Sequence, residues 1–194
     1  EVARFLDSVP ENVAVVFDQA YSEFVSDEQY CDAIDLVRAG RPNVIVLKTF
    51  SKAWGLAGLR VGYGIMSEEV ANEFDTIKEP FNLGNLCSAG AIACLRNGRE
   101  WLADSVAKIK AGRDYLSRGL ADLGCDVVES QANFVLADYH TDARQLAERL
   151  VSQGILIRPA AGWGWPTHVR LTVSTPAGNE RFMNALRADF AANR

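Results

Sequence analysis

Short apolar runs alternate along the chain with segments in which apolar residues recur every three or four positions. Apolar runs of about four to eight residues, bounded by polar ones, are typical of strands buried on both faces of a sheet. The buried strands expected in the first half are residues 13–17, 43–50 and 60–66. Strands and helices that alternate in this way predict an α/β fold.

Two helices are expected in the same half. Residues 26–40 have apolar residues at helical spacing, with Ser26 as the N-cap and Gly40 as the stop. Residues 67–79 form the second helix, which Ser67 opens and the following proline ends.

The second half begins with residues 85–124, which read as almost wholly helical. The first part is small and apolar, which predicts tight packing between other elements. The second part, residues 100–124, is amphipathic and long enough to connect two lobes. The remaining expected elements are strands at 126–130, 133–139, 154–159 and 168–174 and helices at 142–154 and 177–193. Short strands mixed with helices predict a small α+β lobe.

The composition narrows the class of protein. The 194 residues are 48% hydrophobic and 23% charged, with a formal charge of −5 and no basic stripe, which argues against a nucleic-acid partner. No apolar run is long enough to span a bilayer and the N-terminus lacks the plan of a signal peptide, so we expect a cytoplasmic protein without membrane association. The four cysteines form no CxxC pair, so we expect no metal site and reduced, buried thiols.

Asp18, Tyr21 and Lys52 are the first candidates for chemistry. Asp18 follows a predicted strand, at the edge where open α/β sheets place ligand-binding residues, although such an aspartate commonly serves a turn. Tyr21 shares that edge, either as a site residue or as a packing tyrosine. Lys52 lies in a mostly apolar segment, where lost hydration favours the neutral amine that attacks carbonyl groups, unless the side chain reaches water.

Thr49, Ser51 and Arg60 favour the functional interpretation of Lys52. Hydroxyls beside the lysine and an arginine downstream make a small anion site, because arginine binds phosphate oxygens through two parallel hydrogen bonds. A lysine that can form a Schiff base next to a phosphate site indicates pyridoxal 5'-phosphate. An acid such as Asp18 would then keep the pyridine nitrogen of that cofactor protonated.

The sequence resembles the fold-type I aminotransferases, most closely the histidinol-phosphate aminotransferase branch. The segments that carry the resemblance are FDQAYSEF (17–24), TFSKAWGLAGLRVGY (49–63), ANFVL (132–136) and RPAAGWGWPTHVRLTVST (158–175). The resemblance implies an α/β fold that corresponds to the C-terminal part of an aspartate aminotransferase-like, PLP-dependent transferase. The implied parts are a portion of the cofactor-binding large domain at 1–98, a connecting helix at 99–124 and a small α+β domain at 125–194.

The same resemblance implies a role for each candidate. Lys52 would hold the cofactor covalently and then act as acid and base at the α-carbon of the substrate. The resemblance further implies that Asp18 binds the pyridine nitrogen of the cofactor and that Tyr21 binds its phenolic oxygen. Thr49, Ser51 and Arg60 would bind its phosphate. Arg170 would bind the α-carboxylate of the substrate. Gln19 departs from the acid that the family usually carries, with little expected effect.

The implied function is transfer of an amino group between histidinol phosphate or an aromatic amino acid and a 2-oxo acid such as 2-oxoglutarate, within histidine or other amino-acid biosynthesis. A PLP-dependent decarboxylase of a phosphorylated amino acid, or a non-catalytic fragment that binds a partner, stays open as an alternative. Trp163 and Trp165 either favour an aromatic or imidazole substrate or brace their loop. Because the family's glycine-containing phosphate loop has no counterpart here, we expect this chain alone to be incomplete, and the family's shared active sites imply a homodimer.

Overall fold

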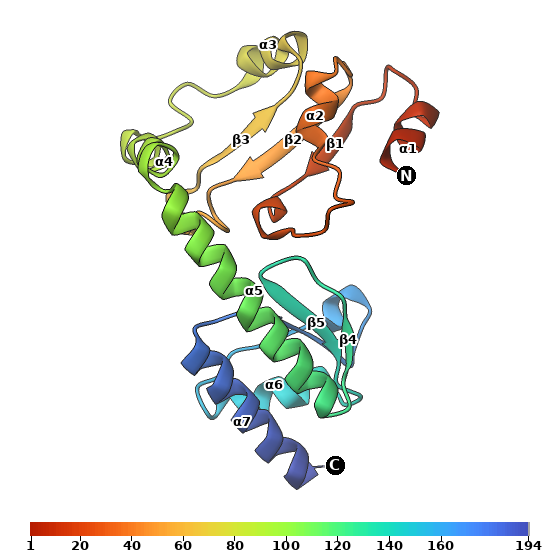
Figure 1. The fold of residues 1–194 in the computed structure, drawn as a ribbon, viewed down its shortest axis with the longest axis vertical. Coiled ribbons are helices and arrows are strands. Elements are labelled where there is room, and N and C mark those ends of the chain that lie inside the picture. The colour runs from red at the N-terminus through yellow and green to blue at the C-terminus, as the bar shows by residue number, and fades with distance from the viewer. Residues whose placement is uncertain (194) are drawn as a thin grey trace. The chain divides into compact units, whose positions relative to one another are not determined.

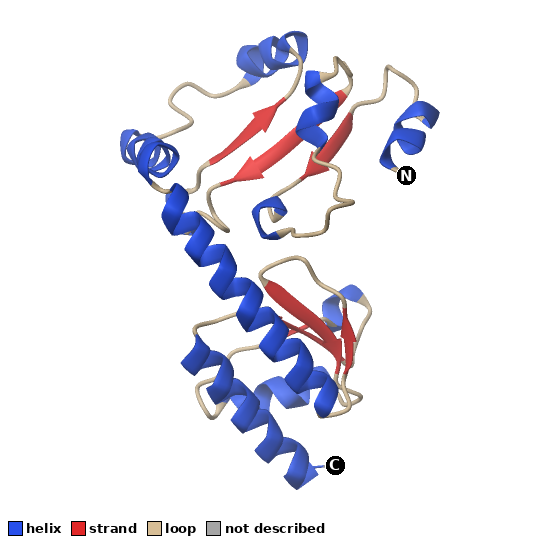
Figure 2. Cartoon of the chain, viewed as in Figure 1, coloured by secondary structure: helices blue, strands red, loops and turns tan. Residues whose placement is uncertain are grey.

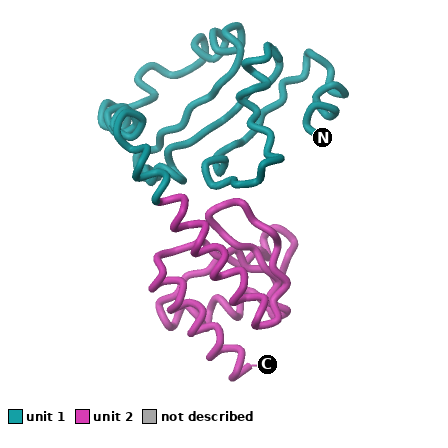
Figure 3. Tube along the Cα trace, viewed as in Figure 1, with its two compact units in different colours: residues 1–104 teal, residues 105–194 magenta. Residues whose placement is uncertain are grey.

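The computed structural model describes residues 1–193, which fall into two compact units, one over residues 1–104 and one that begins at Ser105 (Figure 3). The division falls inside the long helix α5 (Arg99–Asp122). No helix among the described residues is both long and apolar enough to cross a membrane. Each unit has a sheet of its own (Figure 2).

The first unit is built on a three-stranded sheet in the order β1–β2–β3 (Figure 1). Its strands are β1 (Val15–Asp18), β2 (Val44–Thr49) and β3 (Gly62–Ile65). Its helices are α1 (Val2–Ser8), α2 (Ala33–Arg38), α3 (Glu68–Ile77) and α4 (Asn85–Asn97), with short 3₁₀ turns at Ser22–Phe24 and Ala57–Leu59. β1 and β2 run parallel, whereas β3 runs antiparallel to β2.

The two faces of this sheet are covered to different extents by the described residues. On one face, Val44 and Val46 of β2 pack against Leu6 of α1 and Ala33 of α2. On the opposite face, Val16 is 54% and Leu47 41% exposed. The prediction of burial on both faces therefore holds for the start of β2, where Val44, Ile45 and Val46 are all buried, and is wrong for Val16 and Leu47. Alternate side chains of a strand point to opposite faces, and the two helices cover only one of them.

The third predicted strand is also more exposed than expected. All of Gly62, Tyr63 and Gly64 are exposed, and β3 lies at the edge of the sheet with β2 as its partner. An edge strand has a neighbour on one side only, and two glycines provide no side chains to bury.

The predicted helix at 26–40 begins later than expected. Asp32, rather than Ser26, is the N-cap of α2, and its side chain accepts a hydrogen bond from the backbone nitrogen of Ile34 (3.1 Å). Asp27 accepts one from the nitrogen of Gln29 (2.8 Å), which closes a local turn in competition with helix. Gly40 is confirmed as the stop, with φ of +85°, a conformation that glycine adopts without a Cβ penalty.

Residues 85–124 form two helices that meet at Gly98. A Cβ atom there would lie 2.6 Å from the carbonyl oxygen of Cys94, so glycine is required at this junction. The expected tight packing of the first helix is wrong: Ala91 is buried, but Leu86 is 82% exposed and Leu95 is also exposed.

Among the cysteines only Cys125 is buried, so the prediction of buried thiols is wrong for exposed Cys31.

The second unit contains an antiparallel sheet in the order β4–β5–β7–β6. Its strands are β4 (Asp126–Val128), β5 (Phe134–Asp138), β6 (Arg158–Pro159) and β7 (His168–Thr172), and its other helices are α6 (Ala143–Val151) and α7 (Pro176–Asn193). Leu116 and Leu120 of α5 pack with Val135, Leu146 and Met183 in its core. This confirms the expected mixture of short strands and helices.

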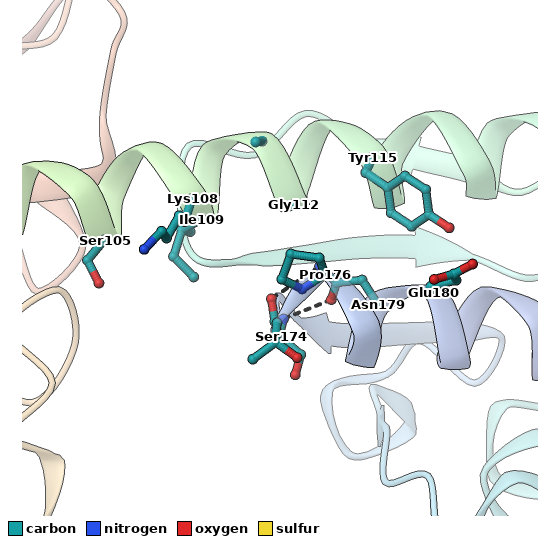
Figure 4. Close-up of a pocket in the computed structure, with 11 residues that line it drawn as sticks. Ser105, Lys108, Ile109, Gly112, Tyr115, Ser174, Pro176, Asn179 and Glu180 are labelled. Atoms are coloured by element: carbon teal, nitrogen blue, oxygen red, sulfur yellow. Dashed lines mark hydrogen bonds between the residues drawn. The ribbon is translucent and has the colours of Figure 1, made fainter.

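A cavity of about 600 Å³ lies between α5 and the start of α7 (Figure 4). Gly112 forms part of its wall, and a Cβ atom there would lie 2.6 Å from Val173 and 2.9 Å from Asn179. The side chain of Asn179 bonds the backbone nitrogen (2.8 Å) and oxygen (3.2 Å) of Ser174, which ties the start of α7 to the end of β7. None of the candidate site residues lines this cavity.

Candidate active site

Asp18 lies at the carboxyl end of β1, beside the end of β2. The parallel register places it opposite Leu47, and the backbone nitrogen of Gln19 donates to the Leu47 oxygen (2.9 Å). Asp18 is exposed, and one oxygen of its carboxylate accepts a hydrogen bond from the nitrogen of Ala20 (3.1 Å). The edge formed by the carboxyl ends of parallel strands is where α/β sheets bind ligands.

Lys52 and Tyr21 meet at this edge. The Nζ atom of Lys52 is 5.3 Å from the centre of the Tyr21 ring, within the range of a cation–π interaction. Tyr21 comes directly before the 3₁₀ turn Ser22–Phe24, three residues after the end of β1. The structure therefore brings together two candidates that lie 31 positions apart in the sequence.

Backbone hydrogen bonds hold the loop that carries Lys52. The nitrogen of Leu56 donates to the oxygen of Phe50 (2.9 Å), and the nitrogen of Gly55 donates to the oxygen of Lys52 itself (3.0 Å). Gly55 has φ of +72°, and a Cβ atom there would lie 3.0 Å from the Trp101 ring. Lys52 thus projects from a fixed bend, and Phe50 anchors that bend in an apolar cluster.

Thr49, Ser51 and Arg60 form a connected polar group. The hydroxyl of Thr49 accepts a hydrogen bond from the nitrogen of Ser51 (3.0 Å), and the Arg60 guanidinium lies 3.5 Å from the Ser51 hydroxyl. Arg60 also donates to the oxygen of Ala57 (2.8 Å) and forms no ion pair with any residue of the described chain. Its φ of 54° is uncommon for a residue with a side chain, and such conformations cluster at functional sites.

The side chain of Gln19 links this edge to the start of α2 by hydrogen bonds, a role that the sequence did not predict. Its side chain is 7% exposed, and with the amide nitrogen toward Asp32 it donates to that carboxylate (2.9 Å). The amide oxygen accepts from the Tyr30 hydroxyl (2.8 Å) and from the backbone nitrogen of Ala33 (2.9 Å). Burial, and then the Asp32 carboxylate, raise the pKa of Tyr30 above its ordinary value.

Lys48 is the other lysine near this edge, and it is already paired. Its Nζ atom donates to the Ser22 hydroxyl (2.7 Å) and lies 3.4 Å from the Glu23 carboxylate, with both charged side chains largely buried. Lys48 and Glu23 therefore attach the segment after Tyr21 to β2. The amine of Lys48 is therefore already held by two partners.

Arg170 lies in the second unit, where a second arginine faces it. The register of β6 and β7 places Arg158 directly opposite Arg170, and both guanidinium groups stack on aromatic rings. The distances are 4.9 Å from Arg158 to the Trp163 ring and 4.2 Å from Arg170 to the Phe134 ring. Like charges directly opposite each other in a sheet are unfavourable without an anion between them. Arg158 was missed because only the strand register pairs it with Arg170.

The two tryptophans before Arg170 have different neighbours. Trp163 packs under Arg158, and the Trp165 ring lies 5.6 Å from that of His168. Each ring therefore contacts a side chain of its own unit, as the bracing interpretation expects.

Comparison with known proteins identifies the family of this chain. Residues 1–186 match the family Aminotransferase class I and II. The chain belongs to this family of aminotransferases. The histidinol-phosphate aminotransferase of Moorella thermoacetica is 40% identical over 183 residues, which are 94% of this chain and 47% of that protein. The chain spans about half the length of the curated relatives it matches.

Solved structures of aminotransferases share the fold. The histidinol-phosphate aminotransferase of Sinorhizobium meliloti, in complex with pyridoxal-5'-phosphate, has a TM-score of 0.89 and 32% identity and covers all of this chain and 53% of its own. The L-threonine-O-3-phosphate decarboxylase of Porphyromonas gingivalis has a TM-score of 0.84 at 24% identity, over 98% of this chain and 58% of its own. The latter likeness concerns the fold alone. The fold predicted from the resemblance, half of an aspartate aminotransferase-like architecture, is confirmed.

Proposed function

We propose that this chain is the part of a PLP-dependent aminotransferase that anchors the cofactor. The observation that carries the proposal is the meeting of Lys52 with Tyr21 at the sheet edge where Asp18 ends β1. The connected group formed by Thr49, Ser51 and Arg60 lies at the end of the neighbouring strand. Its hydroxyls and unpaired guanidinium fit a phosphate, which requires several donors and positive charge.

Each residue has a defined role in this proposal. Lys52 binds the cofactor covalently and, once released, moves a proton at the α-carbon of the substrate, because its amine stays within reach of that atom. Asp18 keeps the pyridine nitrogen protonated, and Tyr21 donates to the phenolic oxygen. When bound, pyridoxal phosphate supplies the electron sink that stabilises negative charge at the α-carbon.

The substrates carry negative charge in this proposal. Arg158 and Arg170 face each other on two strands, and neither forms an ion pair within residues 1–193. Two adjacent guanidinium groups suit a phosphate, as in histidinol phosphate, or the two carboxylates of 2-oxoglutarate. We therefore favour these substrates over an aromatic amino acid, whose only anionic group is one carboxylate.

The proposal extends to domains, assembly and location. Residues 1–98 would belong to the cofactor-binding domain, 99–124 to the connecting helix and 125–194 to the small domain. The complete enzyme would be a homodimer in the cytoplasm and act in histidine biosynthesis. Kinship with biosynthetic aminotransferases supports these statements.

Borohydride trapping tests the role of Lys52. Reduction of the complete enzyme with its cofactor, followed by peptide mapping, should place the label on Lys52, and Lys52→Ala should lose both label and turnover. Lys78→Ala, an exposed lysine paired with Asp75, is the matched control and should keep both. A label on Lys48 would overturn the proposal. Release of carbon dioxide from a phosphorylated amino acid, without transfer of its amino group to a 2-oxo acid, would identify a decarboxylase.

A further inference from the structure

The loop that leads into β5 is fixed at three consecutive carbonyl oxygens. Arg113 donates a hydrogen bond to the oxygen of Ala132 (3.1 Å), and the backbone nitrogen of Val173 donates one to the oxygen of Asn133 (2.9 Å). The hydroxyl of Ser130 donates one to the oxygen of Phe134 (2.7 Å). These donors come from α5, from the end of β7 and from the loop itself. The backbone that positions the Phe134 side chain therefore has little freedom.

Arginine is an unusual residue at the buried position 113, from which it holds the oxygen of Ala132. It is 5% exposed, and its guanidinium forms no ion pair with any residue of the described chain. Burying a charge without a carboxylate partner is costly, and an apolar residue would pack α5 against the sheet at lower cost. The contact that distinguishes Arg113 from an apolar residue is its hydrogen bond to the oxygen of Ala132.

The Phe134 ring connects this loop to Arg170. In the antiparallel register Phe134 pairs with Thr172 and Leu136 with Arg170, so Phe134 and Arg170 are diagonal neighbours on one face. The Arg170 guanidinium lies 4.2 Å from the centre of the ring. Stacking fixes the plane of the guanidinium, and a carboxylate or phosphate forms two parallel hydrogen bonds only in that plane.

We propose that Arg113 is a positioning residue for Arg170 and acts through the 130–134 loop and the Phe134 ring. The inference rests on the proposed function, in which Arg170 binds an anionic group of the substrate. A guanidinium held in its binding orientation loses less conformational freedom when the anion arrives. Arg113 should therefore affect substrate affinity rather than the chemical step.

The first test observes Arg170 directly and needs no turnover. In the complete enzyme labelled with ¹⁵N-arginine, ring currents from Phe134 should shift the Nε–Hε resonance of Arg170, and Phe134→Leu should remove the shift. Arg113→Met should move the same resonance toward the position of a free arginine, and Arg113→Lys, which keeps a donor, should move it less. Arg118→Met, an exposed arginine of the same helix, is the control and should leave it unchanged. An unmoved resonance in Arg113→Met would overturn the inference.

The second test separates positioning from stability by kinetics. Arg113→Met should raise KM for 2-oxoglutarate about tenfold, with kcat within twofold, and Arg113→Lys should restore most of the affinity. In an Arg170→Ala background, Arg113→Met should raise KM no further, because its effect passes through Arg170. Equal increases in KM in the two backgrounds would contradict the inference. An inactive wild-type enzyme would refute the proposed function and leave the resonance test to decide this inference.

Discussion

With its amide nitrogen toward Asp32, the side chain of Gln19 donates a hydrogen bond to the Asp32 carboxylate across 2.9 Å, beside the edge that carries Asp18. The same carboxylate caps α2 through the nitrogen of Ile34. A neutral donor at position 19 therefore satisfies a carboxylate that an acid at this position would repel.

Gln19→Glu should make the stability of the first unit depend on pH. Two carboxylates in this buried place would raise the pKa of one of them in the folded state. Stability should match that of wild type near pH 4 and fall by about 1 to 2 kcal/mol toward pH 7, because the folded state then binds the extra proton more tightly. Urea unfolding at several pH values measures this. Gln29→Glu, at an exposed position, is the control, and equal pH dependence in the two variants would contradict the argument.

Arg60→Ala should weaken binding of pyridoxal phosphate. A charged hydrogen-bond pair to phosphate contributes about 1.5 to 3 kcal/mol, so the dissociation constant should rise about tenfold to a hundredfold. Absorbance titration measures it. Arg60→Gly, which relieves the φ of 54°, should lose affinity equally, whereas Arg38→Ala, at an exposed pair with Asp35, should not. Recovered affinity in Arg60→Gly would show that the backbone, not the guanidinium, matters.

Asp138 should stabilise the second unit only when its carboxylate is ionised, and this contribution should be lost in acid. Burial acts to raise the pKa of Asp138, but hydrogen bonds from the nitrogen of His140 and from Thr167, with the nearby His168 and His140 rings, lower it below its ordinary value of 3.8. Stability from this group is present above about pH 4 and is lost as the pH falls through the lowered pKa. Asp138→Asn should reduce the acid dependence of urea unfolding below pH 4. Asp122→Asn, at an exposed position, should retain it, and an unchanged slope in Asp138→Asn would refute the assignment.

The apolar surface of the first unit should make residues 1–194 self-associate when expressed alone. Ile77, Phe81 and Leu86 are largely exposed, as is Val16 on the open face of the sheet. Exposed apolar side chains and an unpaired strand edge both promote association. Sedimentation velocity should show species larger than a monomer, and Phe81→Ser with Leu86→Gln should reduce them. Val151→Ser in the second unit is the control; a monodisperse, active wild-type monomer would contradict the expectation.

The sequence by itself determined the order of strands and helices, the stop at Gly40, the cap at Ser67 and the set of candidate residues around Lys52. These depend on short-range features, such as apolar spacing, glycine conformation and residue type, which neighbouring positions fix. Tertiary structure alone decided that Val16 and Leu47 stay exposed on one face of the sheet, that Arg158 stands opposite Arg170 and that Gln19 supports Asp32. Strand register and burial arise from contacts between segments distant in the chain, and a one-residue change of register would bring different side chains together.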